Sequence, residues 1–286
     1  MNEREKAINA LIKNARDVST SRKSEVLGWP NIVTAVGKGD GYIPGYIPYI
    51  GKDFFSKKLE GARIIIYALS QNLKSDMDLA KDWATSWHEP DKDEKALNRQ
   101  NCSCEKEGKG IMMHPFDTGH LPVIAAMLLE QLGKNPNSLA SIYDVVAATN
   151  LSKYSFRNAS GRTTDCNESL NKCLEWFTQY EIEILKPDYI ICAGNAVWGM
   201  LNKNKFEGVK IVKVAFPSLQ VINRWHKKYK ACKKYKPDEI LSMLPKNDHE
   251  KDVDYKGKNL RYIIERDFVY FSNMYSEIDK RLKCIP

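Results

Sequence analysis

Short apolar runs that end in polar residues recur along the chain and alternate with longer amphipathic stretches. The segment ARIIIYALSQN, at residues 62–72, is one such run. The segments SIYDVVAATN, DYIICAGNA and VKIVKVAFPS repeat the arrangement at residues 141–150, 188–196 and 209–218. Continuous apolar runs of this length are typical of strands that are covered on both faces. The pattern therefore predicts four central strands, each with a polar tip at its carboxyl end.

The stretches between these runs have the periodicity of helices. Residues 1–25 are amphipathic, and HLPVIAAMLLEQLG at residues 120–133 has a proline near its start and a glycine at its end. NESLNKCLEWFTQYEIEILK, at residues 167–186, stops before Pro187. Alternation of strands and helices predicts an α/β fold, with a central parallel-type sheet and helices on both faces. Because ligands of such sheets bind at the carboxyl ends of the strands, we expect the functional site at the polar tips.

Length and hydropathy limit the class of protein. A chain of 286 residues with 43% hydrophobic content predicts a single domain over residues 1–286, with appendages. We expect a helix and an aromatic loop at residues 1–60, and a charged, tryptophan-bearing insertion or lid at residues 76–110. No apolar run is long enough to span a bilayer, and residues 1–17 lack the apolar core of a signal peptide. We therefore expect a cytoplasmic protein without membrane contact, and a monomer.

The positive charge of the chain is concentrated in one segment. The formal net charge is +8, and residues 203–236 contain eleven lysines or arginines and a single acidic residue, Glu207. A basic segment on a nearly neutral body is typical of proteins that bind the phosphate backbone of nucleic acids. A solvated, lysine-rich surface without a partner is the alternative that this pattern leaves open.

The tip of the second apolar run carries an amide. Asn150 ends the run, and the polar, basic segment that follows contains Lys153, Arg157 and Arg162. An amide offers a donor and an acceptor side by side, which is what reading the edge of a nucleobase requires. Asparagine is also common in turns, so a capping role for Asn150 is the structural alternative.

Several short motifs occur in the order that they have in a known family. PFDTG lies at residues 115–119 and TNLSK at 149–153; Arg162-Thr163 and Glu168 follow, and then CLEW, KPDYIICAGNA and FPS begin at residues 173, 186 and 216. Together these motifs resemble the uracil-DNA glycosylase superfamily, and within it the bacterial and archaeal branch that carries an iron–sulfur cluster. The resemblance extends over roughly residues 60–225. It implies the three-layer α/β/α fold of that superfamily and a role on DNA.

The resemblance also implies roles for individual side chains. A glycosylase turns its target nucleotide out of the duplex and holds the base in a pocket. Phe116 matches the aromatic residue that stacks on the flipped base, and Asn150 matches the amide that reads the base edge. Ser218 matches the serine that contacts a DNA phosphate, and Leu219 the apolar wedge that fills the gap in the stack. The other residues expected to face DNA are Lys153, Arg224, His226, Lys227 and Lys228.

The catalytic positions of the family are changed. Leu69 stands where the branch carries its catalytic acid, and Phe216, expected to line the base pocket, stands where the family has a histidine. Cleavage of an N-glycosidic bond passes through an oxocarbenium-like sugar, which a carboxylate or a positioned water stabilises. We expect polar residues of the first tip to take over this role, with Asp76, Asp117 and His226 as further options. The catalytic candidates are Ser70, Gln71, Asn72 and Asp78.

The cysteines do not match the ligand set of the iron–sulfur branch. The chain has no cysteine before Cys102, and Tyr154 replaces the cysteine that follows the TN..K motif, so that only Cys173 matches. We therefore expect no cofactor. A structural zinc site is the alternative, although the Cys-x-Cys spacing is unusual for zinc. Its ligands would be Cys102, Cys104, His114 and His120.

These observations lead to the hypothesis of a DNA glycosylase that acts on a base other than plain uracil. Related glycosylases take part in antiviral defence by excising glucosylated hydroxymethylcytosine from phage DNA, and Trp83 and Trp87 of the insertion suit a sugar-bearing base. We expect double-stranded DNA with a modified base as the partner. The alternatives are a catalytically inactive nucleic-acid-binding module on the same fold, and an ordinary uracil repair enzyme. A small-molecule enzyme is disfavoured because no strand-to-helix turn has a glycine-rich phosphate loop.

Overall fold

The chain divides into two compact units. The computed structural model describes residues 1–30, 48–69, 119–154, 156, 167–231, 235–250 and 258–283. The first unit comprises Met1–Tyr49, Leu69–Cys102 and Thr149–Lys186, and the second comprises Ile50–Ala68, Ser103–Ala148 and Pro187–Pro286. The chain thus passes between the units several times. The expected insertion at residues 76–110 lies outside the described residues.

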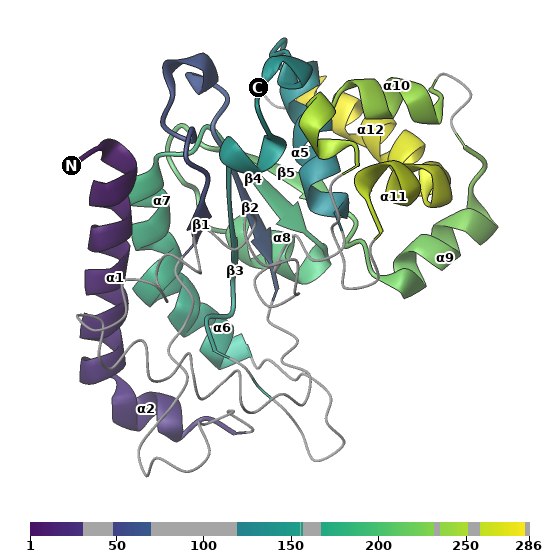
Figure 1. Cartoon of the computed structure of the whole chain (residues 1–286). Coiled ribbons are helices and arrows are strands. Elements are labelled where there is room, and N and C mark those ends of the chain that lie inside the picture. The colour runs from purple at the N-terminus through teal and green to yellow at the C-terminus, as the bar shows by residue number, and fades with distance from the viewer. Residues whose placement is uncertain are drawn as a thin grey trace. The chain divides into compact units, whose positions relative to one another are not determined.

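The described part of the chain contains one mostly parallel sheet, in the strand order β1-β3-β2-β4-β5. Its strands are β1 (Tyr49–Ile50), β2 (Ile64–Ala68), β3 (Val146–Asn150), β4 (Tyr189–Ala193) and β5 (Lys210–Val214). β2 and β5 both pair in parallel with β4, with Ile190 opposite Ile65 and Ile211 (Figure 1). Every residue of β2, β3 and β4 is buried, which explains their continuous apolar sequences. The four predicted strands are confirmed, and β1 is an additional one.

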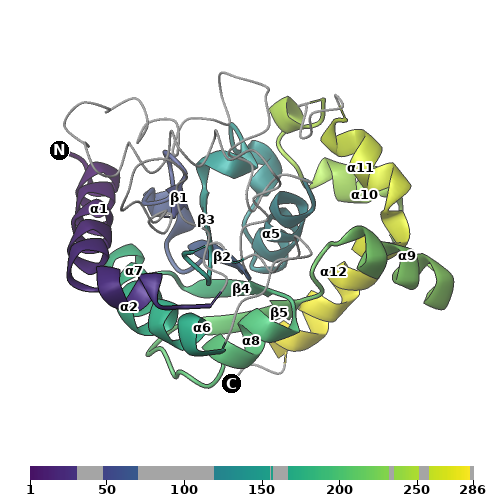
Figure 2. The ribbon, with the colours of Figure 1, turned by 90° about the horizontal axis from the view of Figure 1, so that it is seen from below.

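Helices of the second unit lie on both faces of its strands. α5 (His120–Gln131) and α12 (Phe268–Lys283) lie on one face, and α8 (Asn195–Leu201) packs against β4 and β5 on the other (Figure 2). The predicted α/β fold with a central sheet between layers of helices is therefore confirmed. The other helical elements of this unit are η1 (Lys57–Leu59), η3 (Pro136–Ser138), η4 (Ile142–Asp144), α9 (Leu219–Lys228), α10 (Pro237–Ser242), η6 (Lys246–Asp248) and α11 (Leu260–Arg266).

The first unit is built around two long helical stretches that pack side by side (Figure 1). One consists of α1 (Glu3–Ser21) and α2 (Lys23–Leu27), and the other of α6 (Asn167–Cys173), η5 (Leu174–Thr178) and α7 (Gln179–Leu185). Asn2 and Glu5 form a capping box at the start of α1, since each side chain accepts a hydrogen bond from the backbone N–H of the other. The sequence predicts both stretches as single helices. The structure divides the first at Arg22 and inserts the π-helical turn η5 into the second.

The helices from α9 to α12 extend the fold beyond the segment for which elements were predicted. α12 packs on α5, α9 and β5, and so attaches this region to the sheet. Among the described helices, none has both the length and the apolar composition needed to cross a membrane.

Candidate functional site

Asn150 is the last residue of β3 and has the environment of a binding group. Its side chain is buried, with 4% relative exposure. None of the described residues forms a hydrogen bond with its amide oxygen Oδ1. A buried polar atom without a partner destabilises the fold, so proteins retain such atoms mainly where a ligand or a catalytic role requires them. The capping role, which is the structural alternative, would satisfy this oxygen with a backbone N–H, and the described residues provide none.

The other polar side chains of this strand end are bound within the first unit. Lys153 Nζ donates a hydrogen bond to Thr149 Oγ1 at 2.6 Å. The Ser152 hydroxyl donates to the carbonyl of Tyr154 at 2.9 Å, and the Ser152 N–H donates to the carbonyl of Leu69 at 2.7 Å. Asn150 is thus distinguished from its neighbours, whose polar atoms serve the fold.

Lys153 does not have the exposed position that a contact with DNA requires. Its side chain is buried, and Nζ lies 2.5 Å from Glu181 Oε1 of α7. Burial lowers the pKa of Lys153, and the neighbouring Glu181 carboxylate opposes this shift. The expected role of Lys153 as a DNA-facing residue is therefore corrected: the amine binds a carboxylate inside the first unit.

Cys173, which matches one cysteine of the iron–sulfur branch, is buried beside aromatic side chains. Cys173 Sγ accepts a hydrogen bond from the N–H of Lys153 at 3.4 Å. Tyr154, at the position of a cluster cysteine, packs edge-on against Trp29, which in turn stacks on Trp176. Within the described residues of the first unit Cys173 is the one cysteine, and no group of three or more potential metal ligands occurs in the described part of the chain. Aromatic rings, and no further thiolates, line this region as far as it is described.

Some other buried polar atoms also lack partners in the described part of the first unit. They are the indole N–H groups of Trp29 and Trp176 and the hydroxyl of Thr178. Trp29 and Trp176 belong to the aromatic cluster, and Thr178 to the π-helical turn. None of these three lies at the end of a strand, where ligands of α/β sheets bind.

The start of α9, in the second unit, presents apolar side chains to solvent. Ser218 caps the helix, and its Oγ accepts a hydrogen bond from the N–H of Val221 at 3.3 Å. Leu219 follows with 70% exposure, and Phe216 is 43% exposed. Large apolar side chains at such exposure often mark an interaction surface. Leu219 thus has the exposure of a wedge, whereas the exposed ring of Phe216 is not enclosed in a pocket formed by the described residues.

The polar face of α9 carries the positive charge predicted for a phosphate partner. The helix is attached to α12 through Trp225, whose ring packs against that of Tyr270 with 5.3 Å between the ring centroids. The last turn of α9 is basic, with no acidic residue in the helix. The exposed basic residues are Arg224, His226, Lys227 and Lys228.

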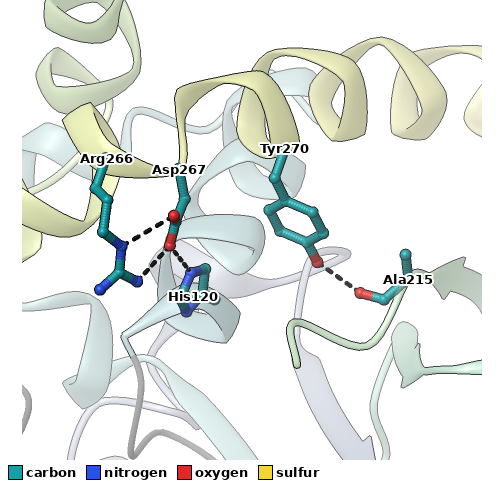
Figure 3. A network of polar contacts seen from close by, with 5 residues as sticks. All are labelled: His120, Ala215, Arg266, Asp267 and Tyr270. Atoms are coloured by element: carbon teal, nitrogen blue, oxygen red, sulfur yellow. Dashed lines mark hydrogen bonds and ion pairs between the residues drawn. The ribbon is translucent and has the colours of Figure 1, made fainter. Parts of the chain in front are cut away.

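A second polar network lies at the start of α5 (Figure 3). Gly119 has a φ of 73°, in the left-handed region that glycine adopts readily, and it precedes His120 in the chain. His120 Nε2 and Arg266 Nη2 lie 2.7 and 2.5 Å from Oδ2 of Asp267, at the junction of α11 and α12. Burial alone would raise the pKa of Asp267, but the hydrogen bonds from His120 and Arg266 lower it to about 2. Asp267 is therefore ionised at neutral pH.

The same network reaches the end of β5. Tyr270 packs against the His120 ring, and its hydroxyl donates a hydrogen bond to the carbonyl of Ala215 at 2.5 Å (Figure 3). Burial raises the pKa of Tyr270 above its usual range. Phe271 stacks on the imidazole ring. His120, an option for zinc in the sequence, is held here by a carboxylate and two aromatic rings.

The remaining expected residues lie outside the described part of the chain. These are the catalytic candidates Ser70, Gln71, Asn72 and Asp78, the stacking residue Phe116, the further options Asp76 and Asp117, and the zinc options Cys102, Cys104 and His114. The described residues thus place Asn150 and α9 in the fold, and the roles expected of the site residues stay predictions.

Sequence reasoning missed two acidic residues that organise these networks. Glu181 carries a signal that would have identified it, because it falls on the apolar face of its helix, at helical spacing from Leu174, Phe177 and Leu185. A carboxylate on an apolar face needs a buried partner. Asp267 carries no comparable signal, since it lies at a helix junction in a region without a recognised motif.

Comparison with known proteins does not assign the chain to a family. No protein-family model matches the sequence, and no curated protein matches it.

Proposed function

We propose that the protein is a DNA glycosylase that flips a modified base out of the duplex and hydrolyses its N-glycosidic bond. The observation that carries this proposal is the buried amide oxygen of Asn150, which has no partner among the described residues. A flipped base that reaches this side chain would supply the missing hydrogen bond through its edge. The order of the motifs from PFDTG to FPS supports the same activity.

The surface of α9 supports a DNA partner. Arg224, Lys227 and Lys228 are exposed on a helix without acidic residues, and the exposed Leu219 follows its capping serine. Basic side chains neutralise phosphates without reading sequence, and an apolar side chain can fill the space that a flipped base leaves in the stack. α9 would therefore contribute affinity, and Asn150 would contribute selection of the base.

The substrate we propose is a bulky modified pyrimidine, with glucosylated hydroxymethylcytosine of phage DNA as the first to test. Leu69 and Phe216 replace the acid and the histidine of the family, and Trp83 and Trp87 belong to the expected insertion. These changes agree better with an enlarged pocket than with the tight pocket of uracil repair. An antiviral role follows if this substrate is correct.

The test measures abasic sites in a panel of oligonucleotides that contain uracil, hypoxanthine, hydroxymethylcytosine or glucosylated hydroxymethylcytosine. Each is offered as a duplex and as a single strand, because mismatched and unpaired bases cost less to flip. We expect release of the glucosylated base and little release of uracil. Asn150→Ala should lower excision by a factor of ten or more, which is the discrimination that about 1–3 kcal/mol of base contact provides, and should largely preserve DNA binding.

The matched control is Asn247→Ala, which removes the same amide from an exposed site. If the Asn150 variant excises as fast as the control, the amide does not read the base. Strong uracil release with an inert glucosylated substrate would instead indicate ordinary uracil repair. DNA binding without any base release would favour the inactive binding module.

A further inference from the structure

The five residues at the tip of β3, Thr149 to Lys153, form a loop that is closed by a side-chain hydrogen bond. Lys153 Nζ donates to Thr149 Oγ1 at 2.6 Å, so the segment from Asn150 to Ser152 lies between two linked side chains. Backbone bonds hold the same loop, from Ser152 N–H to the Leu69 carbonyl and from Lys153 N–H to Cys173 Sγ. The Asn150 amide, whose oxygen has no partner among the described residues, therefore belongs to a segment that is fixed at both ends.

Glu181 fixes this loop to helix α7. Its carboxylate lies 2.5 Å from Lys153 Nζ, and the exposed fraction of the side chain is 0% for Lys153 and 3% for Glu181. Placing two charges in a site without solvent is costly, and apolar residues of similar volume would often be as stable or more stable. A buried pair that adds little stability is best explained by a requirement for one particular geometry.

The helix that carries Glu181 has an unusual local structure. The π-helical turn Leu174–Thr178 directly precedes α7, and Trp176, Phe177 and Thr178 are buried in succession within it. Such turns are rare and occur frequently at functional sites. Glu181 follows on the buried face of the helix, three residues after the turn ends.

The geometry of the strand explains how this pair can act on Asn150. Thr149 and Asn150 are neighbours in β3, and successive side chains of a strand point to opposite faces. The hydrogen bond from Lys153 holds Thr149 on one face of the strand and so restricts the backbone. The backbone in turn orients the Asn150 amide on the opposite face. That orientation matters because a 180° rotation of an amide exchanges its donor and its acceptor. Uracil and cytosine present opposite donor and acceptor patterns at the edge of the ring.

We propose that Lys153 and Glu181 are positioning residues that hold the Asn150 amide in the orientation that selects cytosine-type over uracil-type base edges. This inference rests on the proposed function, because it assumes that Asn150 reads a base. The pair itself contacts no substrate and transfers no proton to it.

The test replaces the pair by apolar residues of similar size, Lys153→Met with Glu181→Leu. Selective ¹⁵N labelling of asparagine reports the side-chain amide of Asn150, whose signal is assigned by its loss in Asn150→Ala. We expect the double variant to fold, with a thermal midpoint near that of the unaltered protein, and to broaden or multiply the Asn150 signal. The ratio of excision rates for cytosine-type and uracil-type substrates should fall by about tenfold or more.

Two further variants keep the inference testable. Glu181→Asp retains the charge and shortens the reach, and it should shift the Asn150 signal even if the double variant does not fold. The control makes the same apolar exchange at the exposed ion pair of α12, Lys283→Met with Asp279→Leu, and should change neither readout.

The outcomes separate this inference from the proposed function. An unchanged Asn150 signal in the folded double variant overturns the positioning role, whatever the enzyme does. An unchanged ratio of excision rates in that variant also overturns it. Absence of excision by the unaltered protein refutes the proposed function, while the amide signal still decides whether the pair orients Asn150.

Discussion

Each unit contains a buried carboxylate bound to a cation, and the two sites differ in their access to solvent. In the first unit Lys153 and Glu181 have 0% and 3% of their side chains exposed. In the second unit Asp267 is 3% exposed, but the Arg266 that binds it is 35% exposed. The Lys153–Glu181 pair is thus sealed from solvent, whereas Asp267 is bound by a partly solvated guanidinium and an imidazole.

Burial disfavours the charged form of both groups, and the two sites differ in how strongly their partners oppose it. Burial disfavours the charged form of Lys153 and lowers its pKa, although Glu181 opposes the shift. At Asp267, by contrast, hydrogen bonds from His120 and Arg266 outweigh burial and lower the pKa to about 2. The network of the second unit therefore stabilises its charged state, whereas in the first unit the Glu181 carboxylate opposes the effect of burial on Lys153. A sealed pair is sensitive to the loss of either partner, whereas a solvated one tolerates it better.

The largest effect is expected for Glu181→Gln. This change leaves the ammonium of Lys153 buried without a carboxylate, and should lower the free energy of unfolding by about 3–5 kcal/mol. Chemical denaturation followed by circular dichroism measures the difference. Glu183→Gln, an exposed position on the same helix, serves as the control and should be nearly neutral. Equal stabilities of the two variants would mean that Lys153 finds another partner or solvent.

A smaller loss is expected for Asp267→Asn. The hydrogen bonds from Arg266 and His120 lose their charge, and the free energy of unfolding should fall by about 2 kcal/mol at neutral pH. Because the folded pKa of Asp267, about 2, lies below the ordinary value, its stabilisation is fully present above about pH 5 and is lost as the pH falls towards 2. The two proteins should therefore converge in stability in acid. A difference that stays constant from pH 6 to pH 2 would contradict the ionised network, and Asp53→Asn is the exposed control.

The smallest effect is expected for Arg266→Gln. Because this guanidinium is 35% exposed, its loss should cost about 1 kcal/mol or less, and the cost should shrink as salt is added. Unfolding measured at low and high salt gives both values. A loss as large as that in Glu181→Gln would show that partial exposure does not protect the second network, and the comparison between the units would fail. Arg281→Gln on α12 provides a solvated reference.

The regular part of the fold could be predicted because it depends on local pattern. Ile64, Ile65 and Ile66 indicate a strand that is covered on both faces, and the run from His120 to Leu129 indicates the buried helix α5. Asn150 was identified in the same way, from its place at the end of an apolar run. The basic segment that includes α9 follows from the density of positive charge between residues 203 and 236, although its helix was not predicted.

The polar interior could not be predicted with the same rules. Lysine is almost never fully buried unless it is paired, so Lys153 was assigned to a DNA surface, and the Glu181 that binds it lies in helix α7, remote in the sequence. The π-helical turn at Leu174–Thr178 leaves the helical periodicity of the sequence largely unchanged, so nothing in that pattern indicates it. The contact of His120 with Asp267 joins segments 147 residues apart, and no local pattern reports such a pairing.

That separation has a consequence for the order in which the protein folds. Closing a loop of 147 residues costs more chain entropy than forming the short-range contacts within a helix, so the imidazole–carboxylate contact is expected late in folding. On the ribosome, His120 emerges long before Asp267, because chains are made from the amino end. Until α12 has been synthesised, the start of α5 lacks the carboxylate and the aromatic rings that enclose its histidine. Nascent chains should therefore expose this apolar helix end while the 147 residues from His120 to Asp267 are made, which makes it a natural binding point for chaperones.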